Sequence, residues 1–285
     1  MAKIAVKVFR NMVRILSGHG LGKNQMVRNV KLRFIDHFKE NYAEIQGHKM
    51  YLDSLFAPIS VTGIWEPVQT EYIKNNVKKG DIVIDLGAHI GYFTLIFAEL
   101  VGVQGRVFAF EPNPQNYSLL MKNVSVNNFT NVTTVQKAVS DETKTIQLFL
   151  SENNTGDNRI FNLNDNMKSI EIESIRLDDF FKNYDYNVGF IKMDIQGSEA
   201  NALVGMKTVL EKNRHLKIIS EFWPYGINGS GNSPEEFLNM LTDLGFKMNR
   251  INHIDKKIEP IEISDLDPAK FNDKSYEENL LFVRE

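Results

Sequence analysis

Short apolar runs alternate with helical segments over most of this chain, and this alternation constrains the fold more than any other feature. The runs 82–86, 106–111 and 132–138 have the composition of buried strands and are bounded by turn residues. The segments 92–101 and 115–126, which lie between them, have helical length and composition. This order of elements predicts right-handed crossovers and a doubly wound, mostly parallel α/β sheet.

The same pattern continues toward the C-terminus. The runs 188–194 and 216–222 predict two more strands, with a helix over 198–212 between them and another over 234–244. Ligands of such sheets bind at the carboxyl ends of the strands. We therefore expect the chemistry to gather around five acids: Asp85, Glu111, Asp141, Asp194 and Glu221.

A long polar segment interrupts this alternation. The runs 144–150 and 169–175 are separated by the Asn- and Asp-rich stretch 151–168, which has the composition of a loop. Long loops in compact domains are often lids or binding elements. We expect this loop to cover a site or to face a substrate.

The glycine-containing stretch 85–91 lies where the first strand ends and a helix begins. Its glycines allow the backbone to pass close under a bound nucleoside and its amino-acid tail. Glu111 ends the next strand and can accept hydrogen bonds from both ribose hydroxyls. Asp141, after the third strand, is a candidate acceptor for the amine of an adenine.

The spacing of the glycines separates two cofactor classes. An NAD site requires Gly-x-Gly-x-x-Gly, whereas this loop has Gly-x-x-x-Gly with His89 inside it and Asp85 before it. Asp85 would repel a pyrophosphate but could accept a bond from an ammonium group. The loop favours S-adenosylmethionine over NAD and over a relic of the fold without a cofactor.

Composition excludes several classes of protein. The 285 residues are 42% hydrophobic and 24% charged, as in a soluble globular protein, and the net charge of −3 argues neither for a nucleic-acid binder nor for an acidic solvating protein. With no cysteine there is no thiolate metal site, which suits a cytoplasmic protein. Residues 1–33 contain eight Lys or Arg and no acid. For this basic segment, a solvated helix is favoured over peripheral membrane contact through residues 1–16.

Three motifs in order resemble the FkbM family of class I methyltransferases over residues 61–285. They are the loop 85–91, the Glu-Pro-Asn at 111–113 and the run 192–199, Lys-Met-Asp-Ile-Gln-Gly-Ser-Glu. The resemblance implies a Rossmann-like, seven-stranded methyltransferase domain over 61–285, preceded by a basic, mainly helical extension over 1–60. His89 and Gln196 depart from the family's Asn and Glu, and Gln196 weakens any metal site built on paired acids.

The resemblance also implies O-methylation of a hydroxyl on a small molecule such as a sugar or polyketide, with S-adenosylmethionine as the donor. The catalytic candidates are Asp194 and Glu199, although an acid at either place can also serve a helix N-terminus. His89 is a further candidate proton acceptor. The candidate cofactor-binding residues are Glu66, Thr70, Asp85, Gly87, Ala88, His89, Gly91, Glu111, Asn113, Asp141 and Asp194.

Two other functions remain open at this stage. A binding module that kept the cofactor pocket and lost turnover would be consistent with the departures at His89 and Gln196. A nucleic-acid methyltransferase could use the basic segment for electrostatic attraction. The sequence is silent on the acceptor and on the oligomeric state.

Overall fold

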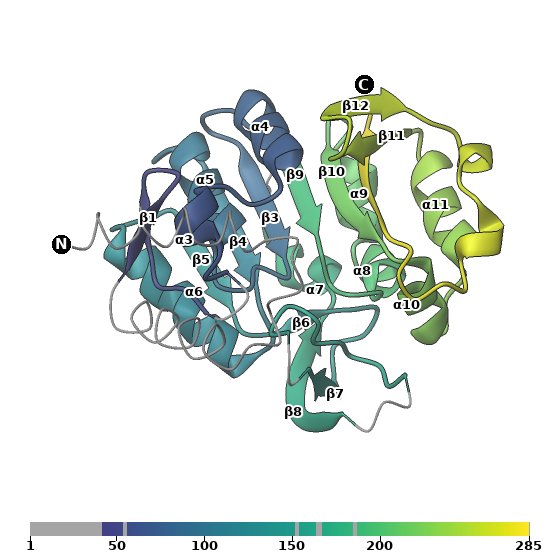
Figure 1. Cartoon of the computed structure of the whole chain (residues 1–285), viewed down its shortest axis with the longest axis horizontal. Helices are drawn as coiled ribbons and strands as arrows, with labels where there is room; N and C mark the ends of the chain where they lie inside the picture. The colour runs from purple at the N-terminus through teal and green to yellow at the C-terminus, as the bar shows by residue number, and fades with distance from the viewer. Residues whose placement is uncertain (1–41, 54–55, 152–153, 164–166, 185–186, 285) are drawn as a thin grey trace, which may run out of the picture.

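An eight-stranded sheet forms the centre of the computed structural model, which describes residues 42–53, 56–151, 154–163, 167–184 and 187–284 (Figure 1). The strand order is β12-β11-β13-β10-β9-β3-β4-β5. Five neighbouring strands are parallel: β3 (Ile82–Leu86), β4 (Arg106–Phe110), β5 (Val132–Val135), β9 (Val188–Met193) and β10 (Lys217–Phe222). The antiparallel pairings involve β11 (Lys247–Asn252), β12 (Lys257–Pro260) and β13 (Glu278–Val283).

The expected doubly wound α/β class is confirmed, with one strand more than the expected seven. The extra strand is β12, which pairs with β11 at the edge of the sheet. The bounds of β3 and of α5 (Tyr92–Val101) agree with the sequence prediction. The helix predicted over 198–212 is two helices, α8 (Glu199–Gly205) and α9 (Lys207–Lys212), because the backbone at Met206 leaves the helical region.

Two hydrophobic cores cover the two faces of the sheet. Successive side chains of a strand point to opposite faces, so Ile84 and Phe108 pack into one core while Val83 and Val107 pack into the other. The first core includes residues of α7 (Leu177–Phe181), α8, α9, α10 (Pro224–Gly229) and α11 (Pro234–Thr242). The second includes residues of α3 (Ile59–Thr62), α4 (Pro67–Asn76), α5 and α6 (Pro114–Val126).

A separate three-stranded sheet lies at the carboxyl end of the central sheet (Figure 1). It consists of β6 (Ala138–Val139), β7 (Thr145–Leu150) and β8 (Lys168–Ile175) in the order β6-β8-β7. The runs predicted at 144–150 and 169–175 are thus strands, but they leave the central sheet. The connection between β7 and β8 contains the polar loop.

The chain before residue 61 joins the same core where it is described. The hairpin of β1 (Ala43–Ile45) and β2 (His48–Met50) buries Ile45 and Met50 in the second core. The Asn123 side chain fixes the following segment, accepting from the Tyr51 N–H at 2.7 Å and donating to its carbonyl at 3.0 Å. Residues 1–41, with the predicted basic helix, lie outside the described residues, so the division at residue 60 stays a prediction.

The remaining short elements are two 3-10 helices, η2 (Ile263–Asp265) and η3 (Pro268–Lys270), between β12 and β13. None of the helices in the described ranges is both long and apolar enough to cross a membrane. The cytoplasmic location stays a prediction.

Candidate cofactor and acceptor site

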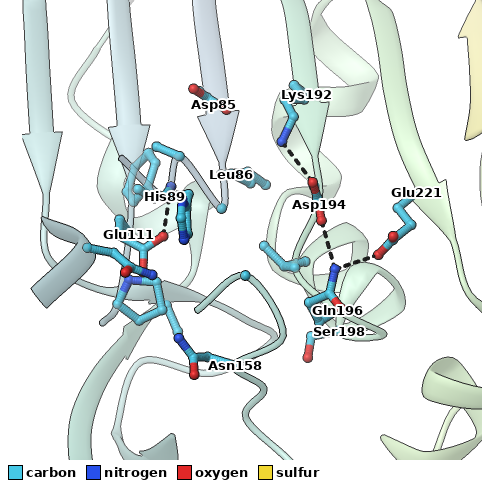
Figure 2. A pocket seen from close by; sticks show the side chains of 18 of the residues that line it. Asp85, Leu86, His89, Glu111, Asn158, Lys192, Asp194, Gln196, Ser198 and Glu221 are labelled. Carbon is cyan, nitrogen blue, oxygen red and sulfur yellow. Dashed lines mark hydrogen bonds and ion pairs between the residues drawn. The ribbon is translucent and has the colours of Figure 1, made fainter. Parts of the chain in front are cut away.

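A cavity of about 290 Å³ lies at the carboxyl ends of β3, β4, β9 and β10. Figure 2 shows two groups of side chains on opposite sides of it. His89, Glu111 and Asn158 form the nucleoside side, whereas Lys192, Asp194, Gln196, Ser198 and Glu221 form what we call the acidic side. Its position agrees with the site expected from the strand order.

Glu111 is held at the end of β4 by three donors. Its Oε2 accepts from the His89 N–H at 2.9 Å, and its Oε1 accepts from the Asn113 N–H at 2.9 Å and from Asn116 Nδ2 at 3.4 Å. Burial raises the pKa of this carboxyl to about 7, and the hydrogen bonds oppose the shift. A carboxylate offers about four lone-pair sites, so acceptor capacity remains for ribose hydroxyls.

Asp85 presents a buried acceptor without a partner. Its Oδ2 accepts from Thr94 Oγ1 at 2.6 Å, whereas Oδ1 is buried and has no hydrogen-bond partner among the described residues. Burial raises the pKa of Asp85, and the nearby Lys192 opposes that shift. A buried acceptor left unpaired is costly, so Asp85 fits the ammonium group of S-adenosylmethionine, bound directly or through water.

The loop after β3 is pressed against the end of β9. Gly87 has φ 74°, and a Cβ there would lie 1.9 Å from the Asp194 carbonyl oxygen, so only glycine fits. Gly91, with φ 94°, is the N-cap of α5 and does not line the cavity. Gly87 and Ala88 do line it.

His89 connects this loop to the polar loop after β7. Its Nε2 lies 3.1 Å from Thr155 Oγ1 and 3.3 Å from Asp53 Oδ2, and Thr155 Oγ1 also donates to Asp53. Burial lowers the pKa of His89, and Asp53 opposes the shift. Through Nε2, His89 therefore attaches the loop, whereas its Nδ1 is buried and has no hydrogen-bond partner among the described residues.

The polar loop lines the cavity in the part that is described, as expected for a covering element. Thr155, Asn158 and Arg159 belong to the lining. The Thr155 carbonyl accepts from Asn116 Nδ2 at 3.0 Å, and backbone bonds between Phe149 and Arg159 close the loop. The loop is thus attached to the nucleoside side through α6 and the glycine loop.

The acidic side is arranged around one amide. Gln196 Nε2 donates to Asp194 Oδ1 at 3.0 Å and to Glu221 Oε2 at 2.9 Å, as Figure 2 shows. Lys192 Nζ lies 3.3 Å from the other oxygen of Asp194. Burial, together with Asp194 and other acids, raises the pKa of Glu221 well above its usual range. Burial and Asp194 likewise raise the pKa of Glu66 to about 7.

Glu199, a predicted catalytic residue, lies away from the cavity. It is fully buried at the start of α8, and its Oε1 accepts from the Ile195 N–H at 3.0 Å. This contact stabilises the turn that carries Gln196. A supporting role for Glu199 is therefore favoured over contact with the reacting atoms.

Three further predicted residues do not line the cavity. Thr70 donates to the Trp65 carbonyl at 2.7 Å, and Asn113 is the N-cap of α6. The Asp141 carboxylate accepts from Ser140 Oγ at 2.8 Å and is not part of the cavity lining, so its contact with an adenine stays a prediction. Glu66 does line the cavity, on the side of Asp194.

Sequence reasoning missed several lining residues. Lys192 lies in β9 two positions before Asp194, which directly follows the strand, so period-two alternation could have placed both side chains on the same side. Thr155, Asn158 and Ser198 carry no such signal, because loops and turns bring them to the cavity.

The fold, the carboxylates at the ends of β3 and β4, and the glycine loop between them define a class I methyltransferase that uses S-adenosylmethionine. A model of the methyltransferase FkbM domain matches residues 85–248, which is more than half of the chain. The chain therefore belongs to the FkbM methyltransferase family. A model of protein-L-isoaspartate(D-aspartate) O-methyltransferase also matches, over residues 10–146.

No curated protein sequence matches the chain. Among solved structures, a putative rRNA methylase from Clostridium thermocellum shares 15% identity at a TM-score of 0.46, covering 76% of this chain and 93% of that one. A putative methyltransferase from Streptococcus mutans, solved with S-adenosylhomocysteine, shares 12% identity at a TM-score of 0.46. The match covers 77% of this chain and 97% of that one. An FkbM methyltransferase from Methylobacillus flagellatus shares 16% identity at a TM-score of 0.44, and the match covers 90% of this chain and 59% of that one.

Proposed function

We propose that this methyltransferase O-methylates a hydroxyl group of a small molecule. The observation that carries the proposal is the pair of carboxylates, Asp194 and Glu221, on the cavity lining opposite Glu111. A hydroxyl must lose its proton to be methylated, and these two groups can accept it. S-adenosylmethionine supplies an already activated methyl group, which leaves binding, orientation and proton removal to the protein.

Glu221 is the better placed of the two to accept a proton. Asp194 is paired with Lys192 at 3.3 Å, whereas no ion pair joins Glu221 to a Lys or Arg of the described ranges. Burial and neighbouring acids raise the pKa of Glu221 well above its usual range, which makes its carboxylate a stronger base than an ordinary one. We assign orientation to Asp194 and proton removal to Glu221, in place of Glu199, the second catalytic candidate after Asp194.

The charge of the cavity favours a small acceptor over a nucleic acid. Glu66, Asp194 and Glu221 would repel the phosphates next to a target base. This charge supports a metabolite as the acceptor.

A screen for release of S-adenosylhomocysteine tests this function. The full chain is incubated with S-adenosylmethionine and a panel of hydroxyl-bearing metabolites, with RNA and an amine panel in parallel. Glu221→Gln should abolish the turnover, and Glu211→Gln, an exposed substitution on α9, should leave it unchanged. Turnover on RNA or amines alone would contradict the proposal, and tight donor binding without any turnover would favour a binding module.

A further inference from the structure

We propose that Asp194, Gln196 and Glu221 form a charge-selective surface for the sulfonium of the donor. The protein then binds S-adenosylmethionine more tightly than S-adenosylhomocysteine, the product, whose sulfur carries no charge. This inference concerns donor against product, so it does not depend on the nature of the acceptor.

The cavity lining contains more acids than cations. The acids of the described lining are Glu66, Asp85, Glu111, Asp194, Glu221 and Glu277, whereas its Lys and Arg residues are Lys137, Arg159 and Lys192. Lys192 is already paired with Asp194. Acids crowded in this way are stabilised by a positive ligand.

Gln196 holds two of these acids together without neutralising them. One amide nitrogen donates to both Asp194 and Glu221, which fixes the carboxylates side by side. A Lys at this place would cancel a charge, and an acid would add one. The backbone of Gln196 has φ 54°, a conformation that side-chain-bearing residues seldom adopt, and such strain is typical of functional sites.

A second, independent observation points to a ligand on this side. Ser198 Oγ lines the cavity, the residue is only 2% exposed, and this hydroxyl has no hydrogen-bond partner within the described part of the chain. Asp85, at the end of β3, also lines the cavity, and its Oδ1 is buried without a hydrogen-bond partner among the described residues. Buried polar atoms are normally satisfied, so these two atoms indicate that a polar ligand completes the site.

The strand order indicates which part of the donor meets this side. Glu111, the ribose acceptor, ends β4, and the neighbouring strands in order are β3, β9 and β10. A donor held by its ribose at Glu111 and by its ammonium at Asp85 directs its reactive end toward Asp194 and Glu221. The positive sulfur is the one charge that distinguishes donor from product.

Isothermal titration calorimetry with three probes tests the proposal on the full chain. The probes are S-adenosylmethionine, S-adenosylhomocysteine and sinefungin, which carries an amine in place of the methylated sulfur. At pH 8 we expect the two cationic probes to bind at least about tenfold more tightly than S-adenosylhomocysteine, as expected for an added charge beside fixed carboxylates. Equal or tighter binding of S-adenosylhomocysteine would overturn the proposal.

Variants assign the preference to these residues. Glu221→Gln should reduce the preference to about threefold or less through loss of affinity for the cationic probes alone. Asp194→Asn gives a second reading if that variant folds poorly, and Glu211→Gln is the matched surface control. An unchanged preference in both site variants, or an equal loss for all three probes, would contradict the assignment. Because no acceptor is used, failure of the proposed O-methylation would not affect the result.

Discussion

The hydroxyl of Thr155 lies 3.1 Å from Nε2 of His89, although 66 positions separate the two residues in the chain. This contact joins the polar loop after β7 to the glycine loop after β3. Both loops line the cavity, so we expect the attachment of the polar loop to affect the affinity for a ligand that the glycine loop binds.

Thr155→Val should loosen this attachment while keeping the size of the side chain. The substitution removes the hydrogen bonds of this hydroxyl to His89 and Asp53, each worth about 1 kcal/mol, so we expect the Kd for S-adenosylmethionine to rise about ten- to thirtyfold. Hydrogen exchange of residues 154–163 should become faster, and exchange of β3 should not change. Unchanged exchange in 154–163 would show that the contact does not hold the loop.

Glu111→Gln should stabilise the cofactor-free protein at alkaline pH while weakening donor binding. The folded-state pKa of Glu111 is about 7 against an ordinary 4.5. The stability this group contributes is therefore present below pH 4.5 and is lost as pH rises through about 7. We expect the variant to gain about 1 kcal/mol over the parent at pH 8, measured by urea unfolding, with no gain at pH 4.5. A gain that is equal at both values would contradict the assigned pKa.

Binding of S-adenosylmethionine should release protons near neutrality. Glu66 and Glu111 have pKa values of about 7. Burial and the neighbouring acids, Asp194 first among them, raise the pKa of Glu221 well above its usual range. A cationic ligand favours the ionised forms, so affinity should increase from pH 6 to pH 8. Calorimetry in phosphate and in Tris at pH 7 measures the protons released. S-adenosylhomocysteine should release fewer, and equal release would argue against coupling to the sulfonium.

Glu199→Ala separates a supporting role from a catalytic one. The substitution leaves the partly buried Ile195 N–H without its acceptor, which should lower the free energy of unfolding by about 1–3 kcal/mol. At a temperature where the variant is still folded, turnover should fall by much less than in Glu221→Gln. A loss of turnover as large as that of Glu221→Gln, with unchanged stability, would restore Glu199 as a catalytic residue.

The parts of this protein that follow from local pattern could be predicted from the sequence. β3 and α5 have the predicted bounds because short apolar runs and the glycines of the 85–91 loop act over a few residues. The loop and Glu111 also indicated the methyl donor, since each follows directly from the end of a strand. The family match over 85–248 agrees with that interpretation.

Only the tertiary structure decided which polar residues meet. Asp141 and Glu199 follow strand ends as the pattern requires, yet local bonds to Ser140 and Ile195 keep them off the cavity. Gln196 bridges Asp194 and Glu221 because β9 and β10 are neighbours in the sheet, and Thr155 reaches His89 because the β7–β8 connection crosses the cavity. Periodicity fixes the face on which a side chain lies, but contacts between distant segments depend on how all the elements pack together.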